Sequence, residues 1–464
     1  MSGRTAPAAS PDPPNSMSPA RRAARPPRLA LHWQILIGVL VGAIAGIVAN
    51  ALYPPDAAGK PNAGLEWTVR NVAEPVGRVF LNLIFMVVLP LVFSALVVGV
   101  AGIGDVKRLG RVGLATLLFT VVFSGVSVVI GVSLTNAVRP GAQLAPEHRT
   151  MLRERYGADA ARLAAEAQQS KSVRDALLDI IPKNPLRELV GAVDGSSPGG
   201  GLLAVMFFAL SLGTALLFAA QRAAPFIAVL EGLFDACLVI IGFAMRLAPL
   251  GVAGLMFALT AVLGLDILRV LAWFIVTTLA GLLLHMLGVY SLVIGLAART
   301  NPLRFFGRIS EAILTAFATS SSNATLPTSL RVARDNLKLR PEVGNFVLTV
   351  GATANQNGTA LYEGVTVLFL AQVFGVDLTL TQQITVAFTC VLAGIGTAGV
   401  PSGSIPFIAL ILQSVGVPAE GIGIILGVDR LLDMCRTTVN VAGDIAIAAC
   451  VDRFENARAA VPDG

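Results

Sequence analysis

The sequence predicts an all-α membrane protein, and three observations lead to that fold class. Of 464 residues, 55% are hydrophobic and only 13% are charged, whereas a soluble domain is roughly 25% charged. The mean hydropathy is +0.75, and apolar runs near the 20 or so residues needed to span a bilayer recur along the chain. Polar breaks interrupt these runs only in the last third. The scarcity of charge excludes an ordinary water-soluble enzyme.

Cysteine, histidine and charge patterns argue against several other classes. The four cysteines lie in apolar runs without C-x-x-C spacing, so a disulfide or zinc framework is not expected. The three histidines are far apart and no phosphate-binding G-x-x-x-x-G-K-[ST] motif occurs, which weakens metal hydrolysis and ATP-driven transport. The net charge of +6 comes from residues at the ends of apolar segments. This placement indicates membrane topology rather than nucleic-acid binding.

Residues 1–30 are rich in Pro, Ala, Ser and Arg and predict a disordered, basic, cytoplasmic tail. The apolar run Trp33–Leu52 that follows is long enough to span, so it is read as the first membrane helix rather than a cleaved signal peptide. Five further spans are predicted at Val79–Gly104, Leu109–Val138, Leu202–Ala220, Phe226–Leu247 and Leu268–Leu296.

Short basic loops alternate between these helices and place the N-terminus inside. By the same count, the polar stretch 139–200 lies outside, although long loops translocate largely regardless of charge. Its segment Asp179–Pro185 carries two prolines and is expected to begin the fourth helical element.

Two similar breaks follow position 302. Phe317–Pro327 and Ala393–Ser404 each place small polar residues and a proline between two short apolar arms. Unpaired backbone at bilayer depth is tolerated only inside protein or beside a water-filled cavity. A full-length helix follows each hairpin, at about Val343–Phe374 and about Ile422–Val451. The order predicts two units of inverted topology, the pattern of secondary transporters with a site at the midplane.

One face of the last helix carries polar residues at steps of 4, 3, 4 and 4, namely Asp429, Asp433, Arg436, Asn440 and Asp444. Such a stripe cannot face lipid, because each charge costs about 2.5–3.5 kcal/mol there. With three acids to one base, the surplus negative charge predicts a bound cation or a proton, and Asp444 with Asn440 is the expected ligand pair. Arg436 offers a planar fork for a carboxylate. The alternative is a self-neutralising network that only fixes helix packing.

Two further breaks carry polar groups. Gly351–Thr359 contains two Asn, a Gln and two Gly, and predicts an unwound segment whose carbonyls could bind a hard cation; a glycine kink without ligands is the alternative. The serine run 320–322 is read as a hairpin tip that binds an anion through hydroxyl and N–H groups. A hydrolase nucleophile is the other reading, but no base lies nearby in sequence.

Taken together, four motifs resemble the dicarboxylate/amino acid:cation symporters, the family that includes the excitatory amino acid transporters. They are Ser-Ser-Ser-Asn-Ala-Thr-Leu-Pro at 320–327, Asn-x-x-Gly-Thr at 355–359, Gly-Thr-Ala-Gly-Val-Pro at 396–401, and Asp-x-x-x-Asp-x-x-Arg-Thr-x-x-Asn-Val-x-Gly-Asp at 429–444. The resemblance covers roughly Trp33 to Asp452.

The resemblance implies eight transmembrane helices plus two re-entrant hairpins in a homotrimer, with a transport domain that moves like an elevator. Residues 31–300 would hold the six N-terminal helices, which supply the scaffold, the trimer contacts and part of the transport domain. Residues 301–452 would hold the substrate and ion sites, and 453–464 a cytoplasmic tail. No covalent cofactor is implied.

By the same resemblance, Arg436 would bind the substrate's side-chain carboxylate, Asp433 its amino group, and the remaining substrate contacts would come from Ser321, Ser322, Thr359, Thr437 and Asn440. One sodium site would use Gly351, Asn355, Asn440 and Asp444. A second would use carbonyls of Thr353, Gly394, Ile395 and Thr397. The gate over both would be the hairpin tip made of Gly396, Thr397, Ala398, Gly399, Val400, Pro401, Ser402, Gly403 and Ser404.

The chain also departs from the family pattern. Where the family has Asn-Met-Asp-Gly-Thr, this chain has Gln356 and Asn357, so a carboxylate is replaced by an amide. Near the family's deeper sodium site, positions that align with hydroxyl residues read Thr120, Phe123 and Ser124, and Phe123 supplies no oxygen. We therefore expect the third sodium site to be absent or altered, with fewer sodium ions or with protons in their place. A second arginine that relatives place near the site is also missing at positions 320, 434 and 435, which makes potassium counter-transport doubtful.

The leading hypothesis is a symporter, not an enzyme, that couples uptake of glutamate or aspartate to sodium or proton entry. Asp433 favours a substrate with an amino group, because a plain dicarboxylate would meet like charge there. A C4-dicarboxylate:cation symporter is the close alternative, and an anion channel the alternative from another class. The expected place is the bilayer of the plasma, or bacterial inner, membrane, with both termini cytoplasmic.

Overall fold

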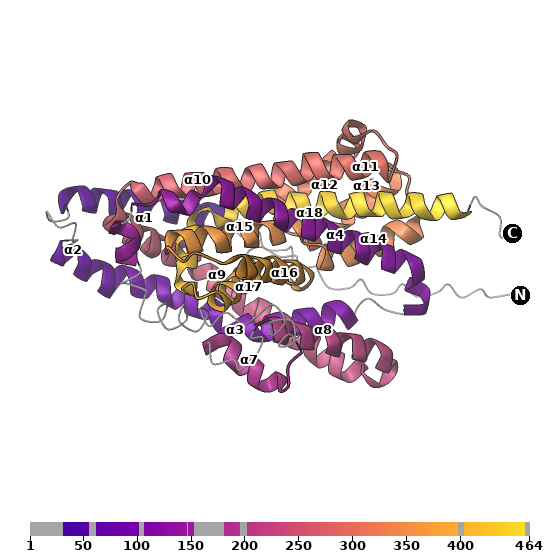
Figure 1. Cartoon of the computed structure of the whole chain (residues 1–464), viewed down its shortest axis with the longest axis horizontal. Helices are drawn as coiled ribbons and strands as arrows, with labels where there is room; N and C mark the ends of the chain where they lie inside the picture. Colours follow the sequence, from indigo (N-terminus) through magenta and orange to yellow (C-terminus); the bar gives the residue numbers. More distant parts are fainter. Residues whose placement is uncertain are drawn as a thin grey trace, which may run out of the picture.

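The computed structural model describes residues 31–54, 62–101, 106–145, 147–152, 181–194, 202–397 and 403–459. Within these ranges the chain is α-helical with short 3₁₀ and π segments and contains no strand, which confirms the all-α prediction. The predicted N-terminal tail, most of the predicted outer loop and part of the second hairpin tip lie outside the described residues. Figure 1 shows an elongated bundle in which most long helices run along the same direction.

The N-terminal helices pack mainly on one another. Helices α1, α3 and α8 associate with α9, directly or through α3. Their bounds are α1 Leu31–Leu52, α2 Ala63–Thr68, α3 Glu74–Ala101, α4 Val106–Val138, α7 Pro185–Asp194, α8 Leu202–Ala219 and α9 Ala224–Leu263. Pro182 precedes α7 and Pro185 is its first residue, so a helix does begin at the end of the segment Asp179–Pro185.

Small residues set the distance between α1 and α9. Gly38, Gly42 and Gly46 recur every four residues on α1, and a Cβ added at Gly42 would lie 2.3 Å from the carbonyl oxygen of Ala253. The same added atom at Gly38 would lie 2.3 Å from the carbonyl oxygen of Pro249. Only glycine permits this backbone approach, which is how membrane helices pack without a hydrophobic driving force.

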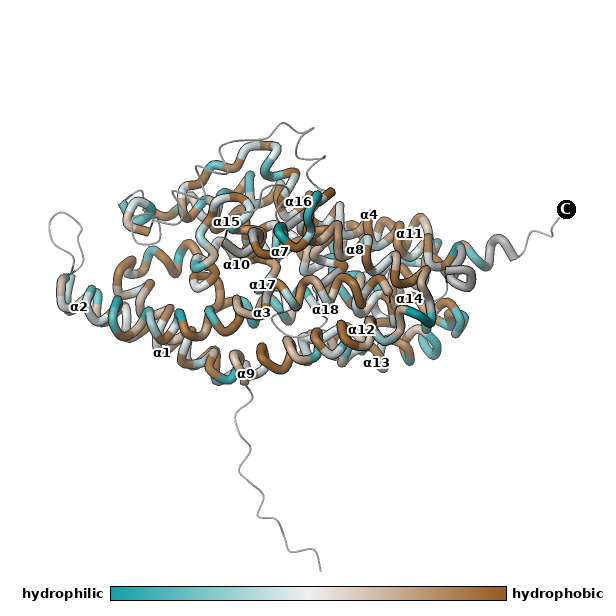
Figure 2. The backbone as a smooth tube through the Cα atoms, turned by 90° about the horizontal axis from the view of Figure 1, so that it is seen from below, coloured by the Kyte–Doolittle hydropathy of each residue, from teal (hydrophilic) through white to brown (hydrophobic). Residues whose placement is uncertain are grey.

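Apolar side chains cover the outer faces of the same helices. On α1, Trp33, Leu40 and Ile44 are more than half exposed, and on α9 Val229 and Phe243 are equally open. Hydrophobic colour runs along both helices in Figure 2. An apolar face of this length cannot be left in water, so it faces lipid or another protein.

The C-terminal half contains two helix pairs and two long helical elements. Helices α12 and α13 form the first pair, and α16 and α17 form the second. A break separates α14 from α15, and α18 runs lengthwise past all of them (Figure 1). Their bounds are α10 Asp266–Leu283, α11 Ser291–Leu296, α12 Pro302–Thr319, α13 Ser322–Asp335, α14 Pro341–Ala354, α15 Asn357–Val373, α16 Leu380–Gly396, α17 Ile405–Ser414 and α18 Ile422–Ala459.

Six helical stretches are long and apolar enough to cross a membrane among the described residues, and they differ from the predicted list in three ways. The predicted span Leu202–Ala220 is not among the six, because the apolar stretch Ala204–Ala219 is shorter. The stretch at 224–263 is 40 residues long because α9 continues through Pro249, so the predicted end at Leu247 was wrong. Prolines are tolerated in membrane helices because neighbouring groups satisfy the freed carbonyl. The last helix also qualifies and extends past the predicted boundary at 452 to Ala459.

An ion pair holds the loop before α14 against the end of α18. Arg340 donates from Nε to Asp452 Oδ1 at 2.8 Å and from Nη2 to the Asp452 carbonyl at 3.0 Å. Asp452 is 7% exposed. The pair joins the start of α14, which leads to the break at 355–356, to α18, which carries the polar stripe.

The close approach of α1 to α9 predicts opposite outcomes for two glycine-to-alanine changes. Alanine favours a helix over glycine by up to about 1 kcal/mol, and Gly242 on α9 has nothing within 4 Å of an added Cβ. We expect Gly242→Ala to keep or raise the melting temperature, and Gly42→Ala to lower it despite its better helix propensity. Thermal unfolding of the purified protein in one detergent measures both. Equal stabilisation by the two changes would contradict the packing role of Gly42.

Candidate functional site

Polar residues from four separate regions line one cavity with an empty volume of about 220 Å³. This volume includes space that is open to solvent. The lining residues come from the tip between α12 and α13, the break between α14 and α15, both ends of the break between α16 and α17, and the middle of α18: Ser320, Ser322, Gln356, Thr359, Thr397, Gly403, Ser404, Asp433, Arg436 and Thr437.

A buried arginine forms the charged side of this cavity. Arg436 is 1% exposed. It donates from Nε to Asp433 Oδ1 at 2.9 Å and from Nη1 to Asp429 Oδ1 at 3.2 Å. Its Nη2 lies 2.8 Å from the same Asp433 oxygen, and its guanidinium carbon lies 4.3 Å from the ring centroid of Tyr362. The structure therefore contains the self-neutralising network that was the alternative reading, and the network opens onto a cavity.

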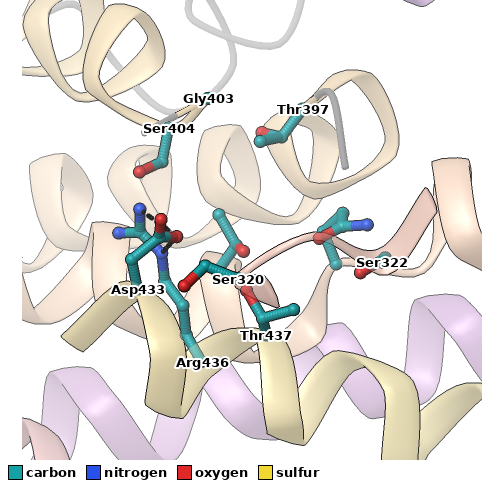
Figure 3. Close-up of a pocket in the computed structure, with 10 residues that line it drawn as sticks. Ser320, Ser322, Thr397, Gly403, Ser404, Asp433, Arg436 and Thr437 are labelled. Atoms are coloured by element: carbon teal, nitrogen blue, oxygen red, sulfur yellow. Dashed lines mark hydrogen bonds and ion pairs between the residues drawn. The ribbon is translucent and has the colours of Figure 1, made fainter. Parts of the chain in front are cut away.

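Three serine hydroxyls complete the cavity without a partner in the described part of the chain. The Oγ atoms of Ser320, Ser322 and Ser404 are buried and make no hydrogen bond there. Figure 3 shows Ser320 and Ser404 pointing toward Asp433 and Arg436. A buried hydroxyl without a partner costs about 1–3 kcal/mol. Three such hydroxyls in the lining of a cavity that also contains a guanidinium mark a place where a ligand would supply the missing partners.

The tip between α12 and α13 corrects one predicted contact. Ser321 caps α13, because its Oγ accepts from the backbone N–H of Ala324 at 3.2 Å, and it does not line the cavity. Ser320 takes the left-handed backbone conformation, with φ of 50°, and its side chain lines the cavity in place of Ser321. Ser322 lines the cavity as predicted.

The break between α14 and α15 confirms the predicted interruption at 351–359. Asn355 and Gln356 have non-helical backbone angles. Asn440 of α18 closes the break: its Oδ1 accepts from the N–H groups of Gly358 at 2.7 Å and Thr359 at 3.3 Å. Its Nδ2 donates to Gln356 at 2.5 Å and Thr359 at 3.1 Å. Asn440 thus lies at the site as predicted, with both ends of its amide occupied by protein.

The first predicted ion site is brought together around Asp444. Asn355 donates from Nδ2 to Asp444 Oδ1 at 2.7 Å, and a Cβ at Gly351 would lie 2.6 Å from the same oxygen. Asp444 is 4% exposed. An almost fully buried carboxylate with one amide donor calls for a cation or a proton.

The second predicted ion site is only partly assembled. Thr397 donates to the carbonyl of Ala393 at 2.8 Å, and Gly394 lies against the carbonyl of Gln356. Thr353 is exposed and its hydroxyl donates to the carbonyl of Val350, while Ile395 is half-buried. Helices α14 and α16 do contact each other. A cation role for these four carbonyls stays a prediction.

The predicted gate falls partly outside the described residues. Ala398, Gly399, Val400, Pro401 and Ser402 lie there. Gly396 ends α16, and Thr397, Gly403 and Ser404 line the cavity on the two sides of that gap. The second hairpin therefore reaches the cavity, and its gating role stays a prediction.

The region expected to lack a third cation site holds a chain of neutral groups. Tyr290 donates from its hydroxyl to Asn357 Oδ1 at 2.9 Å, and Asn357 donates from Nδ2 to Asn355 Oδ1 at 3.3 Å. Phe123 is fully buried and stacks on Tyr290 with 5.2 Å between ring centroids. The ring of His285 packs edge-on against both. Apolar rings and an occupied amide thus lie where the relatives' pattern would place a carboxylate and hydroxyl oxygens.

Two ionisable residues near the site were missed or left without a role. Glu363 on α15 is fully buried; its Oε1 accepts from Thr397 at 3.5 Å and its Oε2 has no partner among the described residues. Arg430 lies three residues before Asp433 and places Nη1 3.4 Å from Asp433 Oδ2. Helical periodicity does not predict a role for Arg430, because its Cα lies off the polar stripe of α18. The i, i+3 spacing between Arg430 and Asp433 is nevertheless present in the sequence. Between residues 429 and 444 of α18 there are therefore three acids and two bases, not three acids and one base.

Comparison with known proteins places this geometry in a family. Among curated proteins, the chain is 31% identical to the proton/sodium-glutamate symport protein of Bacillus subtilis (strain 168), covering 92% of this chain and 93% of that one. It is 30% identical to the proton/glutamate-aspartate symporter of Escherichia coli (strain K12), over 92% and 94%. It is also 30% identical to excitatory amino acid transporter 3 of Oryctolagus cuniculus, over 94% and 88%. A family model for the sodium:dicarboxylate symporters matches residues 31–454, and the chain belongs to that family.

Proposed function

We propose that this protein is a secondary active symporter that takes up glutamate or aspartate together with sodium ions or protons. One observation carries the proposal: Arg436, 1% exposed, lines a cavity together with three serine hydroxyls that have no partner among the described residues. A guanidinium binds a carboxylate through two parallel N–H donors. The three relatives are named for glutamate, aspartate or excitatory amino acids.

The membrane arrangement belongs to the same proposal. Six of the described stretches can span a bilayer by length and composition. With α8 and the broken α14–α15 element they make eight transmembrane helices. The pairs α12–α13 and α16–α17 act as re-entrant hairpins of inverted topology. Ser320 and Ser322 of the first pair and Thr397 and Ser404 at the ends of the second line one cavity. We place this cavity near mid-membrane, where irregular backbone is tolerated because it is enclosed in protein.

We base the proposed division into a scaffold and a moving transport domain on how the helices pack. The glycine-lined contact of α1 with α9 suits a rigid scaffold within residues 31–300, whereas residues 301–452 carry nearly all of the cavity and ion ligands. The segment 301–452 would move across the scaffold as an elevator, in a homotrimer, in the bacterial inner membrane with both termini cytoplasmic. The gate would be the tip of the second hairpin, residues 396–404.

Coupling to cations is proposed for two buried carboxylates, Asp444 and Glu363, that lie on α18 and α15 outside the contacts of Arg436. Asp444, with Gly351, Asn355 and Asn440, is the proposed sodium ligand, and the carbonyls of Thr353, Gly394, Ile395 and Thr397 form the second proposed site. Glu363 is the proposed proton carrier, since a buried carboxyl group with a single hydroxyl donor is stable there only when protonated or paired.

Uptake of labelled aspartate, glutamate and succinate into proteoliposomes, under imposed sodium or proton gradients, tests the function. We expect concentrative aspartate or glutamate uptake with at least one gradient. Arg436→Lys should reduce apparent affinity by at least about tenfold, because an ammonium cannot replace the bidentate fork. Arg331→Lys is the control, since Arg331 pairs with Glu311 at an exposed surface. Free chloride conduction without uptake under either gradient would overturn the symporter proposal in favour of a channel.

The sodium dependence separates the ion sites. Asp444→Asn removes the only carboxylate of the first site, so the sodium dependence of uptake should become less steep, because only the second proposed site remains. Asn357→Asp alone should leave the Hill coefficient for sodium unchanged, because Phe123 supplies no oxygen and Tyr290 holds the side chain at position 357. Uptake measured against sodium concentration gives both results. A steeper sodium dependence in the Asn357→Asp variant would show that a third site can form despite Phe123.

Proton coupling is assigned to Glu363. Glu363→Gln keeps the shape and can still accept from Thr397, but it cannot carry a proton. We expect this variant to lose uptake driven by a pH gradient and to keep the exchange of internal for external substrate. Uptake and exchange assays on the same proteoliposomes measure the two quantities. Undiminished uptake under a pH gradient would exclude Glu363 as the carrier.

A further inference from the structure

We propose that Arg299, Arg304 and Arg308 bind the headgroup phosphate of an anionic glycerophospholipid, whose acyl chains lie along an apolar stripe on α10 and α11. This binding site is separate from the cavity and adds a lipid ligand to the proposed transport activity. It depends only on the membrane placement of the stretch 266–296, which is long and apolar enough to cross a bilayer. Figure 1 shows α10 and α11 along one edge of the bundle.

The stretch 266–296 exposes an apolar stripe along one face. The stripe consists of side chains that are each more than half exposed, namely Val276, Leu283, Leu287, Leu292 and Leu296. They follow one another at steps of seven, four, five and four residues, which keeps them on one helical face. The step of five crosses the π-helical segment Leu284–Tyr290, whose i→i+5 bonding makes a wider turn. The stripe is about 30 Å long at the helical rise, close to the thickness of the hydrocarbon core, so its end at Leu296 reaches the level of the headgroups.

Arg299 follows directly after the end of the stripe. It lies three residues beyond Leu296, where the chain turns back and the N–H of Thr300 donates to the carbonyl of Ile294 at 3.1 Å. The turn gives Arg299 a left-handed backbone conformation, with φ of 50°, and leaves it exposed. Because the hydrogen bond keeps this loop against the last turn of α11, a headgroup at the end of the stripe lies within reach of Arg299.

Arg304 and Arg308 continue the basic surface on α12. They lie four residues apart and are both exposed, so they share one helical face. Helices α11 and α12 contact each other, which places the start of α12 near the end of the stripe. Leu303, beside Arg304, is 83% exposed. An exposed leucine next to exposed arginines is typical of the bilayer interface, where apolar atoms lie among acyl chains and the charged ends lie among headgroups.

The three arginines lack the carboxylate partners that neighbouring arginines have. On α13, Arg331 pairs with Glu311 of α12, and Arg334 pairs with Asp335. No ion pair involves any of the three within the described part of the chain. Like charges held near one another on a surface repel. An anion from outside the protein would relieve that repulsion.

Helix stability and membrane topology do not explain this arrangement. A cation in the first turn of a helix is disfavoured by the helix dipole, yet α12 has Arg304 in that turn and no acidic residue there. Asn301 already caps the N-terminus by accepting from the N–H of Arg304, so the helix end needs no further partner. Topology requires basic residues in the loop, but it does not require them to be unpaired beside an apolar stripe.

An anionic glycerophospholipid satisfies both parts of this surface. Its phosphate accepts parallel N–H donors from a guanidinium, and its acyl chains cover the leucines, which are unfavourable in water. A zwitterionic lipid carries its own cation next to the phosphate and gains less from the arginines. Free phosphate would reach the arginines and leave the stripe uncovered. The surface therefore favours a lipid with net negative charge, such as phosphatidylglycerol.

Thermal unfolding of the detergent-purified full chain measures this binding without any transport. Phosphatidylglycerol and phosphatidylcholine with identical acyl chains are titrated, and the midpoint of the melting-temperature shift gives an apparent affinity for each. We expect the wild type to bind phosphatidylglycerol at least about tenfold more tightly. A triple variant with Arg299→Gln, Arg304→Gln and Arg308→Gln should lose that preference. The corresponding triple lysine variant should keep it within about threefold, because the attraction depends mainly on charge.

Two further measurements control for folding and for nonspecific charge. Arg334→Gln is the matched control, because Arg334 is exposed on the same helix pair but already pairs with Asp335, and it should keep the wild-type preference. Raising the salt concentration from about 0.05 to about 0.5 M screens exposed charges. In the unmodified protein this change should reduce the preference for phosphatidylglycerol and leave the affinity for phosphatidylcholine unchanged.

Equal affinity of the wild type for the two lipids, or an unchanged preference in the triple glutamine variant, would overturn the inference. Inorganic phosphate at the same ionic strength should not reproduce the shift. An equal shift with phosphate alone would assign the arginines to a free anion and overturn the lipid assignment. A protein that shows the lipid preference but takes up neither amino acid under either gradient would overturn the proposed function alone.

Discussion

A guanidinium buried in a membrane helix needs anionic partners, and this requirement organises the C-terminal half of the protein. Arg436 holds Asp433 and Asp429 on its own helix and the ring of Tyr362 on α15. Tyr362 in turn donates to Asp429. Because these contacts join α15 to α18, the broken α14–α15 element is fixed against the charged cluster that Arg430 and Arg436 form with Asp429 and Asp433. The cavity beside these contacts is lined by serine hydroxyls that have no partner in the described part of the chain.

The backbone breaks are held open by a second set of contacts. Interrupting a helix at bilayer depth frees N–H and carbonyl groups that lipid cannot satisfy. Asn440 caps the N-terminus of α15, and Asn355 reaches Asp444 across the same break. The carbonyl of Asn357 accepts from Ser127 of α4 at 2.8 Å. One broken element therefore supplies the cavity wall, the predicted ion ligands and the contact with the preceding helices.

The sequence predicts the apolar helices and the polar breaks, because both depend on local composition. It places the end of the fifth span wrongly, since α9 continues through Pro249. It identifies Arg436, Asp433 and Asp444 from helical periodicity, but periodicity gives the direction of a Cα and not the reach of a long side chain, so Arg430 is missed. Ser320 rather than Ser321 lines the cavity, and this placement accompanies the left-handed backbone conformation of Ser320, which the sequence does not predict. The contacts of Tyr290 with Asn357 and of Asn440 with the break join residues far apart in sequence, and no local pattern encodes them.

The neutrality of the charged cluster has an electrical consequence. Moving one uncompensated charge through a membrane potential requires about 2.3 kcal/mol per 100 mV. The two arginines and two aspartates carry no net charge, so the empty cluster can be exposed to either side of a bilayer without electrical work. Membrane voltage then acts on the solutes that the carrier loads and on the remaining carboxylates, Asp444 and Glu363. The residues proposed to bind the substrate are thus distinct from the carboxylates, Asp444 and Glu363, on which the membrane potential acts.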